Sequence, residues 1–338
     1  MTDNTWPTVD TELIDDVTLY SAKLIIPVTG PVIIDGAVAI HGDRVVHVGK
    51  RRWVLKALKQ EMTAHGTIHE RHWDGVLTPG LINAHTHLQY SGMVQVGQGT
   101  YDRFRAWELA FNEVYAEAQK TQPWKQWAED GARQMVESGT TAAADIVTDL
   151  DAAGALASQG MHGIAYWEVM GWHNAEWMEK GRTELIRQLR RMNEEQLPNL
   201  GISPHAPYTL ESEPFVDLPD IARQLNMRLH IHLAETPLEA GTYPPVLTTY
   251  SAADWSDHDW ESYRQLKEVG KGASAIQFVD QLGSLGPDVH IAHGVWANGE
   301  DRRILRQRGV GVALCPRSNR ITNTGKDAPV REYLEEGN

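Results

Sequence analysis

One short stretch of this 338-residue chain places two histidines where they restrict both fold and chemistry. The largely apolar segment Val76–Ala84 leads through Pro-Gly into His85 and His87. On a β-strand, residues i and i+2 face the same side, so both imidazoles point at one spot. Imidazoles that converge in this way are typical ligands of a metal ion. The stretch therefore favours a metal-dependent hydrolase.

The amino-acid composition of the chain limits which partners it can bind and in which compartment it is expected. The net charge of −14 disfavours nucleic acid and anionic membranes, because both require a basic patch. No apolar run approaches the ~20 residues that span a bilayer, and residues 1–10 lack the apolar core of a signal peptide. The single cysteine, Cys315, excludes an internal disulfide. We expect a cytoplasmic protein that acts on a small-molecule substrate and binds neither nucleic acid nor membrane. A homodimer is a possible oligomeric state.

The first part of the chain is predicted to form a small β-sandwich over residues 1–75. Strand-like runs alternate with turns before one short helical stretch. The runs are Leu19–Val28, Val32–Ile40 and Val45–Gly49, followed by the helical stretch Trp53–Met62.

From residue 76 to 338, strand-like segments alternate with amphipathic helical ones. The predicted strands are Gly80–His85, Thr141–Ile146, Gly163–Val169, Leu200–Pro204, Arg228–Leu233, Val289–His293 and Gly309–Leu314. The predicted helices include Arg103–Lys120, Trp124–Ser138, Glu176–Gln196, Leu218–Asn226 and Asp301–Arg308. This alternation implies a parallel sheet with right-handed crossovers. A run of this length predicts an α/β fold, a (β/α)₈ barrel with its active site at the C-terminal strand ends.

The strand count falls one short of closure. About seven strands can be identified, where a closed barrel of this type needs eight. A last helical stretch, Val330–Glu336, is followed only by Gly337 and Asn338. We therefore expect a fragment of a longer protein, with a strand swapped in from a partner chain as the alternative.

Polar residues follow several of the predicted strands. A lone histidine, such as His41 or His162, is most simply an ordinary polar or core residue. Histidines at four strand ends are less easily explained that way. The set comprises His85 and His87, His205, His232 with Glu235, His293, and the segment Cys315–Asn319.

The sequence around these residues resembles the amidohydrolase superfamily. It is most similar to the branch of adenosylhomocysteine, methylthioadenosine, guanine and aminodeoxyfutalosine deaminases and the triazine hydrolases. Each short motif is weak alone, but five in order are specific. They are Pro79–His87, Ser203–Tyr208, His232–Glu235, Ala292–Gly294 and Cys315–Asn319.

The resemblance implies a role for each strand-end residue. Glu235 would be the proton shuttle, His293 would orient the attacking water, and His205 would contact substrate. Binuclear relatives use a strand-four lysine that this chain lacks, so one divalent ion is expected, zinc ahead of iron. Its implied ligands are His85, His87 and His232.

The expected chemistry agrees with those roles. A divalent ion lowers the pKa of bound water toward ~7. The resulting hydroxide would attack an electron-poor ring carbon that bears an amino group. Glu235 would then move the proton from the water to the ring nitrogen and help ammonia leave. The alternative for Glu235 is a solvated loop acid.

One residue that the resemblance requires is absent. The family places an aspartate after strand eight, where it binds the metal and the water. Asp327 is the nearest acid downstream of strand seven, but its surroundings indicate a loop, and we do not assign it this role. The 338-residue chain alone is therefore expected to bind metal weakly and to turn over little substrate.

Substrate selection is less constrained. Trp107 would stack on a purine or pack within its helix. Glu168 would accept hydrogen bonds from ribose hydroxyls or serve as a structural acid. Arg317, or Arg103 or Arg105, would pair with a ligand carboxylate. We also predict Asn319 among the substrate-binding residues.

The best-supported function is hydrolytic deamination of an aminopurine nucleoside or related heterocycle. Glu168–Gly171 and Ser203–Tyr208 look slightly more like the aminodeoxyfutalosine branch, which serves menaquinone synthesis. Two alternatives remain open: a triazine or cyclic-amide hydrolase with the same site, and a catalytically inactive fragment that acts as a binding or assembly module.

Overall fold

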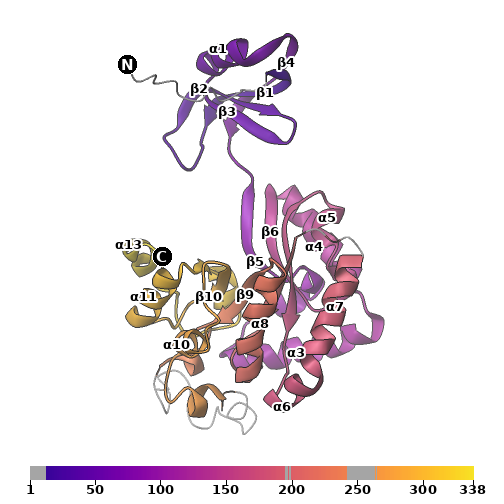
Figure 1. Ribbon diagram of the computed structural model, residues 1–338, viewed down its shortest axis with the longest axis vertical. Coiled ribbons are helices and arrows are strands. Elements are labelled where there is room, and N and C mark those ends of the chain that lie inside the picture. The colour runs from indigo at the N-terminus through magenta and orange to yellow at the C-terminus, as the bar shows by residue number, and fades with distance from the viewer. Residues whose placement is uncertain (1–12, 195–196, 198, 242–262, 264) are drawn as a thin grey trace, which may run out of the picture. The chain divides into compact units, whose positions relative to one another are not determined.

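The chain divides into two compact units, Met1–Gly80 and Leu81–Asn338 (Figure 1). The computed structural model describes residues 13–194, 197, 199–241, 263 and 265–338. The two units are described separately.

The first unit contains one four-stranded sheet in the order β3-β2-β1-β4. Strand β1 runs antiparallel to β2 and parallel to β4. The elements are β1 (Ile14–Ile25), β2 (Ile33–His41), β3 (Arg44–Lys50), helix α1 (Arg51–Glu61) and β4 (Met62–Leu77).

Helix α1 supplies the layer that covers this sheet. It buries Val54 and Leu58 in one cluster with alternate residues of β1 and β2: Val17, Leu19, Ala37 and Ala39. The described residues thus form one sheet backed by a helix, where a β-sandwich was expected. The period-two pattern of the strands predicts a buried face but not what covers it.

The unit boundary also differs in detail from the predicted one at residue 75. Val76 and Leu77 pair with Leu24 and Ile25 of β1, so they extend the small sheet. The apolar run before His85 is therefore shared between two strands, and the second begins at Leu81.

The second unit is a nearly closed parallel barrel of seven strands in the order β11-β10-β9-β8-β7-β6-β5. All seven predicted strands are confirmed. They are β5 (Leu81–Thr86), β6 (Thr140–Val147), β7 (His162–Val169), β8 (Leu200–Pro204), β9 (Arg228–Leu233), β10 (Val289–His293) and β11 (Gly311–Ala313). Among the described strands, β5 and β11 are the two edges of the sheet.

The predicted helices are present and lie outside the strands (Figure 1). The main ones are α3 (Phe104–Thr121), α4 (Trp124–Glu137), α7 (Arg182–Glu194), α8 (Ser212–Gln224), α11 (Gly299–Arg308) and α13 (Val330–Glu336). Helix α7 is preceded by a π-helical turn, Trp177–Gly181, within the stretch predicted as one helix. Among the described residues, every helix is too short or too polar to traverse a lipid bilayer.

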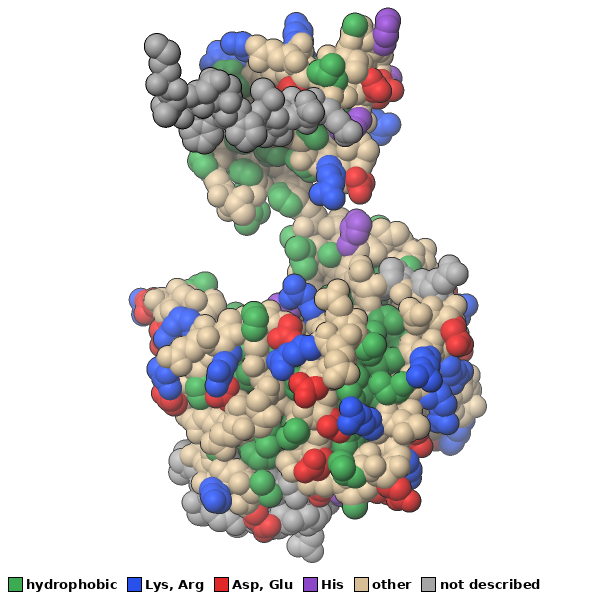
Figure 2. Space-filling model, in the orientation of Figure 1, with side chains coloured by type: hydrophobic (Ala, Val, Ile, Leu, Met, Phe, Trp, Pro, Cys, Tyr) green, Lys and Arg blue, Asp and Glu red, His purple; other side chains and the backbone are tan. Residues whose placement is uncertain are grey.

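The barrel core joins strands to the surrounding helices. Ile202, Leu229 and Ile291 on the strands are completely buried in one cluster with Phe215 and Leu218 of α8. Burial of strands by helices is typical of parallel sheets. On the visible surface, basic and acidic side chains are interspersed (Figure 2).

We expect the stability of the small unit to fall at low pH because of one carboxylate, that of Glu70. Glu70 on β4 accepts two hydrogen bonds from Arg51 and one from Ser21, each 2.6 Å long. The Arg51 bonds, and then the Ser21 bond, lower the pKa of Glu70 to about 2. Because this is below its unfolded value of 4.5, the stabilisation is complete above that pH and is lost as the pH falls toward 2.

The measurement is hydrogen exchange of the β1 and β4 amides against pH. Glu70→Gln should speed exchange at pH 6, and its difference from wild type should shrink between pH 4.5 and 2. Asp43→Asn, at an exposed position of the same unit, is the control. A difference that does not change with pH would contradict the prediction.

Candidate metal centre

Histidines from four barrel strands gather at the C-terminal ends of the strands. His85 lies on β5 and His87 directly follows it, while His232 and His293 lie at the ends of β9 and β10. His205 follows β8. Parallel strands carry their C-terminal ends to one side of a barrel, which is why these distant histidines meet.

Three of these histidines are placed to share one ion. The ligand atoms of His85, His87 and His232 all lie within 4.8 Å of one another. The Nε2 atoms of His87 and His232 are 3.2 Å apart. Two nitrogens about 2.0–2.1 Å from one ion lie roughly 3.0–3.4 Å apart in octahedral or tetrahedral geometry. The set therefore fits a divalent metal.

The protonation state of the three rings also suits a metal. Desolvation, and then neighbouring imidazoles, lower the pKa of His87 to about 3. The same causes hold the pKa of His85 and His232 well below the usual value. All three are neutral at pH 7, and neutral imidazole is the form that binds a metal.

Hydrogen bonds behind two of the three rings, those of His85 and His232, fix their orientation. Nδ1 of His232 lies 3.2 Å from the carbonyl oxygen of His205, so its N–H donates there and Nε2 keeps a lone pair. Nδ1 of His85 lies 3.0 Å from Nε2 of His230, and these two rings are stacked 5.0 Å apart. His230 was not singled out in the sequence. Its position two residues before His232 on the same face of β9 was the available signal.

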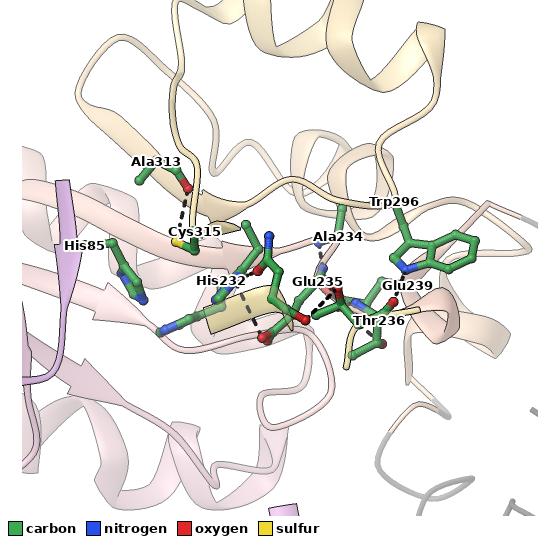
Figure 3. Close-up of polar contacts among 12 residues, drawn as sticks. His85, His232, Ala234, Glu235, Thr236, Glu239, Trp296, Ala313 and Cys315 are labelled. Carbon is green, nitrogen blue, oxygen red and sulfur yellow. Dashed lines mark hydrogen bonds and ion pairs between the residues drawn. The ribbon is translucent and has the colours of Figure 1, made fainter. Parts of the chain in front are cut away.

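Glu235 lies near His232 (Figure 3), and the ring of His293 lies 5.4 Å from that of His85 and 5.6 Å from that of His232. Oε1 of Glu235 is 3.5 Å from Nδ1 of His293. Burial raises the pKa of Glu235 to about 8. A carboxyl group that holds a proton near neutral pH suits acid–base work. His293 has φ of 74°, a left-handed conformation that is rare for a non-glycine residue and typical of functional sites.

Asn319 lies on the short helix α12 (Pro316–Ile321) after β11. It was predicted to bind substrate. Its carboxamide oxygen lies 2.9 Å from Nδ1 of His293, so that N–H donates to it. Its Nδ2 is buried with no hydrogen-bond partner among the described residues. One side of the amide thus orients His293, and the other remains available as a donor.

Glu168 and His205 form the neighbouring wall. Oε1 of Glu168 lies 3.9 Å from Nδ1 of His232 and 4.0 Å from Nε2 of His205. That oxygen has no hydrogen-bond partner among the described residues, and burial raises the pKa of Glu168 to about 8. A cavity of about 290 Å³ opens beside Glu168, with Trp172 and Arg187 in its lining.

Arg317 and Trp107 were also predicted to bind substrate, and neither has a hydrogen bond or ring contact with the histidine trio among the described residues. Arg317 is exposed on α12. Trp107, on α3, packs against Phe104 and Phe111 at ring distances of 5.3 and 5.5 Å. Phe111 in turn contacts Tyr90, which stacks on His87, so Trp107 approaches the histidines only through other rings. Its geometry matches the packing alternative.

Comparison with known proteins gives consistent matches. A family model described as "Amidohydrolase family" matches residues 76–243. A 5-methylthioadenosine/S-adenosylhomocysteine deaminase of Moorella thermoacetica is 29% identical, with 93% of this chain and 66% of that protein covered. The deaminase of the same name from Thermococcus kodakarensis is 30% identical, with 78% of this chain and 56% of that protein covered. The chain thus spans 56–66% of the length of these two relatives.

Solved structures share the fold at low identity. Helicobacter pylori aminofutalosine deaminase, in complex with methylthio-coformycin, superposes with a TM-score of 0.73 at 17% identity, covering 95% of this chain and 74% of that one. A Xanthomonas campestris adenosine deaminase with bound zinc gives 0.70 at 20% identity, covering 96% and 68%. The resemblance found in the motifs is confirmed: residues 76–243 match the amidohydrolase family, and relatives named as deaminases align over most of this chain.

Proposed function

We propose that this chain comes from a metal-dependent enzyme that hydrolytically deaminates an aminopurine nucleoside or a related heterocycle. The observation that carries the proposal is the site itself: three neutral histidines beside a buried carboxyl group, Glu235, that can exchange a proton. The names of the relatives support the choice of substrate class, because the two quoted are adenosine-type deaminases.

The proposed ligands are His85, His87 and His232, which would hold one divalent ion, with zinc as our choice. When bound, such an ion supplies Lewis acidity that makes water a better nucleophile. A structural neighbour with bound zinc supports that choice of ion.

The protein side chains would carry the remaining steps. In its ionised form, Glu235 would take a proton from the attacking water on Oε1 and deliver it to a ring nitrogen of the substrate. The carbon gains a C–O bond. Glu235 would then pass the proton of the new hydroxyl group to the amino group, the C–N bond breaks, and ammonia leaves with a carbonyl product. His293, held by Asn319 and within 3.5 Å of Glu235, would orient the water.

Glu168 and His205 are our candidates for the substrate wall. Because Glu168 is buried and its Oε1 has no partner among the described residues, a ligand hydroxyl could satisfy it. Its pKa, raised to about 8 by burial, keeps it protonated at pH 7 and able to donate as well as accept. This pattern suits a hydroxyl-bearing ligand such as a nucleoside.

A substrate panel tests this function. Ammonia release should be fastest with adenosylhomocysteine, methylthioadenosine, 5′-deoxyadenosine or aminodeoxyfutalosine. A chlorinated triazine and a cyclic amide are the comparison compounds. Preference for either would overturn the proposal in favour of the alternative hydrolase.

His87→Ala should abolish stoichiometric metal binding. The full-length parent protein should carry about one equivalent of divalent metal, measured by mass spectrometry after gel filtration. The matched control is His162→Ala, since His162 is exposed at the start of β7, at the other end of the strands. Two tightly bound equivalents in wild type, or full binding in His87→Ala, would contradict the ligand assignment.

Glu235→Gln should keep the metal and lose most turnover. Glutamine is nearly isosteric but cannot shuttle a proton, and general acid–base catalysis contributes typically about 10²–10⁴-fold. Metal content and kcat are measured on the same samples. Turnover near the wild-type value would show that another group carries the proton.

A further inference from the structure

A second glutamate binds the backbone that carries Glu235. Glu239 is completely buried in the short helix Pro237–Glu239, after the end of β9. Its Oε1 accepts a hydrogen bond from the N–H of Ala234 at 2.9 Å. Its Oε2 accepts from the N–H of Glu235 at 2.9 Å and from that of Thr236 at 3.0 Å. Figure 3 shows these residues gathered in one turn.

Helix capping explains only one of these three bonds. Thr236 and Glu239 form a capping box, in which the glutamate accepts from the N–H of the N-cap residue. The bonds from Ala234 and Glu235 lie before the helix and are not required by the cap. Glu239 therefore reaches back into the segment that bears the proposed proton shuttle.

That segment needs external support. Ala234 has φ of 55°, a left-handed conformation that alanine rarely adopts. Its carbonyl oxygen accepts a 2.7 Å hydrogen bond from the N–H of Trp296, so the peptide is held from both sides. The backbone torsions at residue 234 set the direction in which the next side chain leaves, and the Glu235 carboxyl group lies 3.5 Å from His293.

We propose that Glu239 is a positioning residue for the reaction: its carboxylate fixes the Ala234–Thr236 backbone so that the Glu235 side chain points at the site. This rests on the proposed function, in which Glu235 moves the proton. Among the described residues, Glu239 has no hydrogen bond or ion pair with the histidine trio, and its partners are Ala234, Glu235 and Thr236.

The first test replaces the carboxylate by an amide. In Glu239→Gln one oxygen becomes an NH₂ group, which faces N–H donors and cannot accept from them. We expect kcat to fall about 10- to 100-fold, as for other supporting residues. KM and metal content should stay within about twofold. Hydrogen exchange at the amides of residues 234–236 should become faster.

A double-mutant cycle separates positioning from general support. If Glu239 acts through Glu235, then adding Glu239→Gln to Glu235→Gln should change kcat by less than about twofold. An equal loss in both backgrounds would overturn the proposal. Asp301→Asn is the matched control, because Asp301 is also a buried capping-box acid, on α11 and bonded to Asn298. Any kcat loss it causes should be the same in both backgrounds.

Two further arms keep the test decisive. If Glu239→Gln does not fold, then Glu239→Asp, which keeps the carboxyl group but is one methylene shorter, enters the same cycle with the same expectations. If wild type releases ammonia from no substrate, the proposed function fails, and amide exchange alone judges Glu239. Faster exchange at residues 234–236 than in Asp301→Asn would support the positioning role, and unchanged exchange would overturn it.

Discussion

Parallel alignment of the barrel strands is the constraint on which the site depends. Each strand delivers its last side chains to the same end, so residues as far apart in sequence as His85 and His293 approach within a ring distance of 5.4 Å. The register keeps them level, since His232 pairs with Ala292 of β10 and Glu168 of β7 with Ser203 of β8. A one-residue slip would turn these side chains to the outer face.

Sequence periodicity could predict the strands and the histidines but not the partners behind them. The apolar runs and the His-x-His spacing are local signals, and they located the strands and placed His85 and His87 together. The contacts of His230 with His85 and of Asn319 with His293 join elements that are distant in sequence. The helix of the small unit was predicted as Trp53–Met62, but its packing on the sheet was not, because a buried strand face does not reveal what covers it.

Local conformational rules fail where the proposed chemistry is concentrated. Two of the non-glycine residues with positive φ lie next to Glu235: Ala234 precedes it in sequence, and His293 lies 3.5 Å from its carboxyl group. Backbone strain of this kind persists only when surrounding contacts over-determine it. Here the contacts are the carboxylate of Glu239 on one side and the carboxamide of Asn319 on the other. The same few hydrogen bonds therefore determine both the stability and the geometry of the site.

The histidine trio also connects two strands of the barrel that are not neighbours in the sheet. Strand β5 is an edge of the described sheet, and β9 lies four places from it in the strand order. His85 and His87 come from the first, and His232 from the second. An ion bound by all three would tie an edge strand to a central one across the interior. A metal that binds only the folded site adds its binding free energy to the free energy of unfolding. Metal binding and folding of the barrel would therefore be coupled.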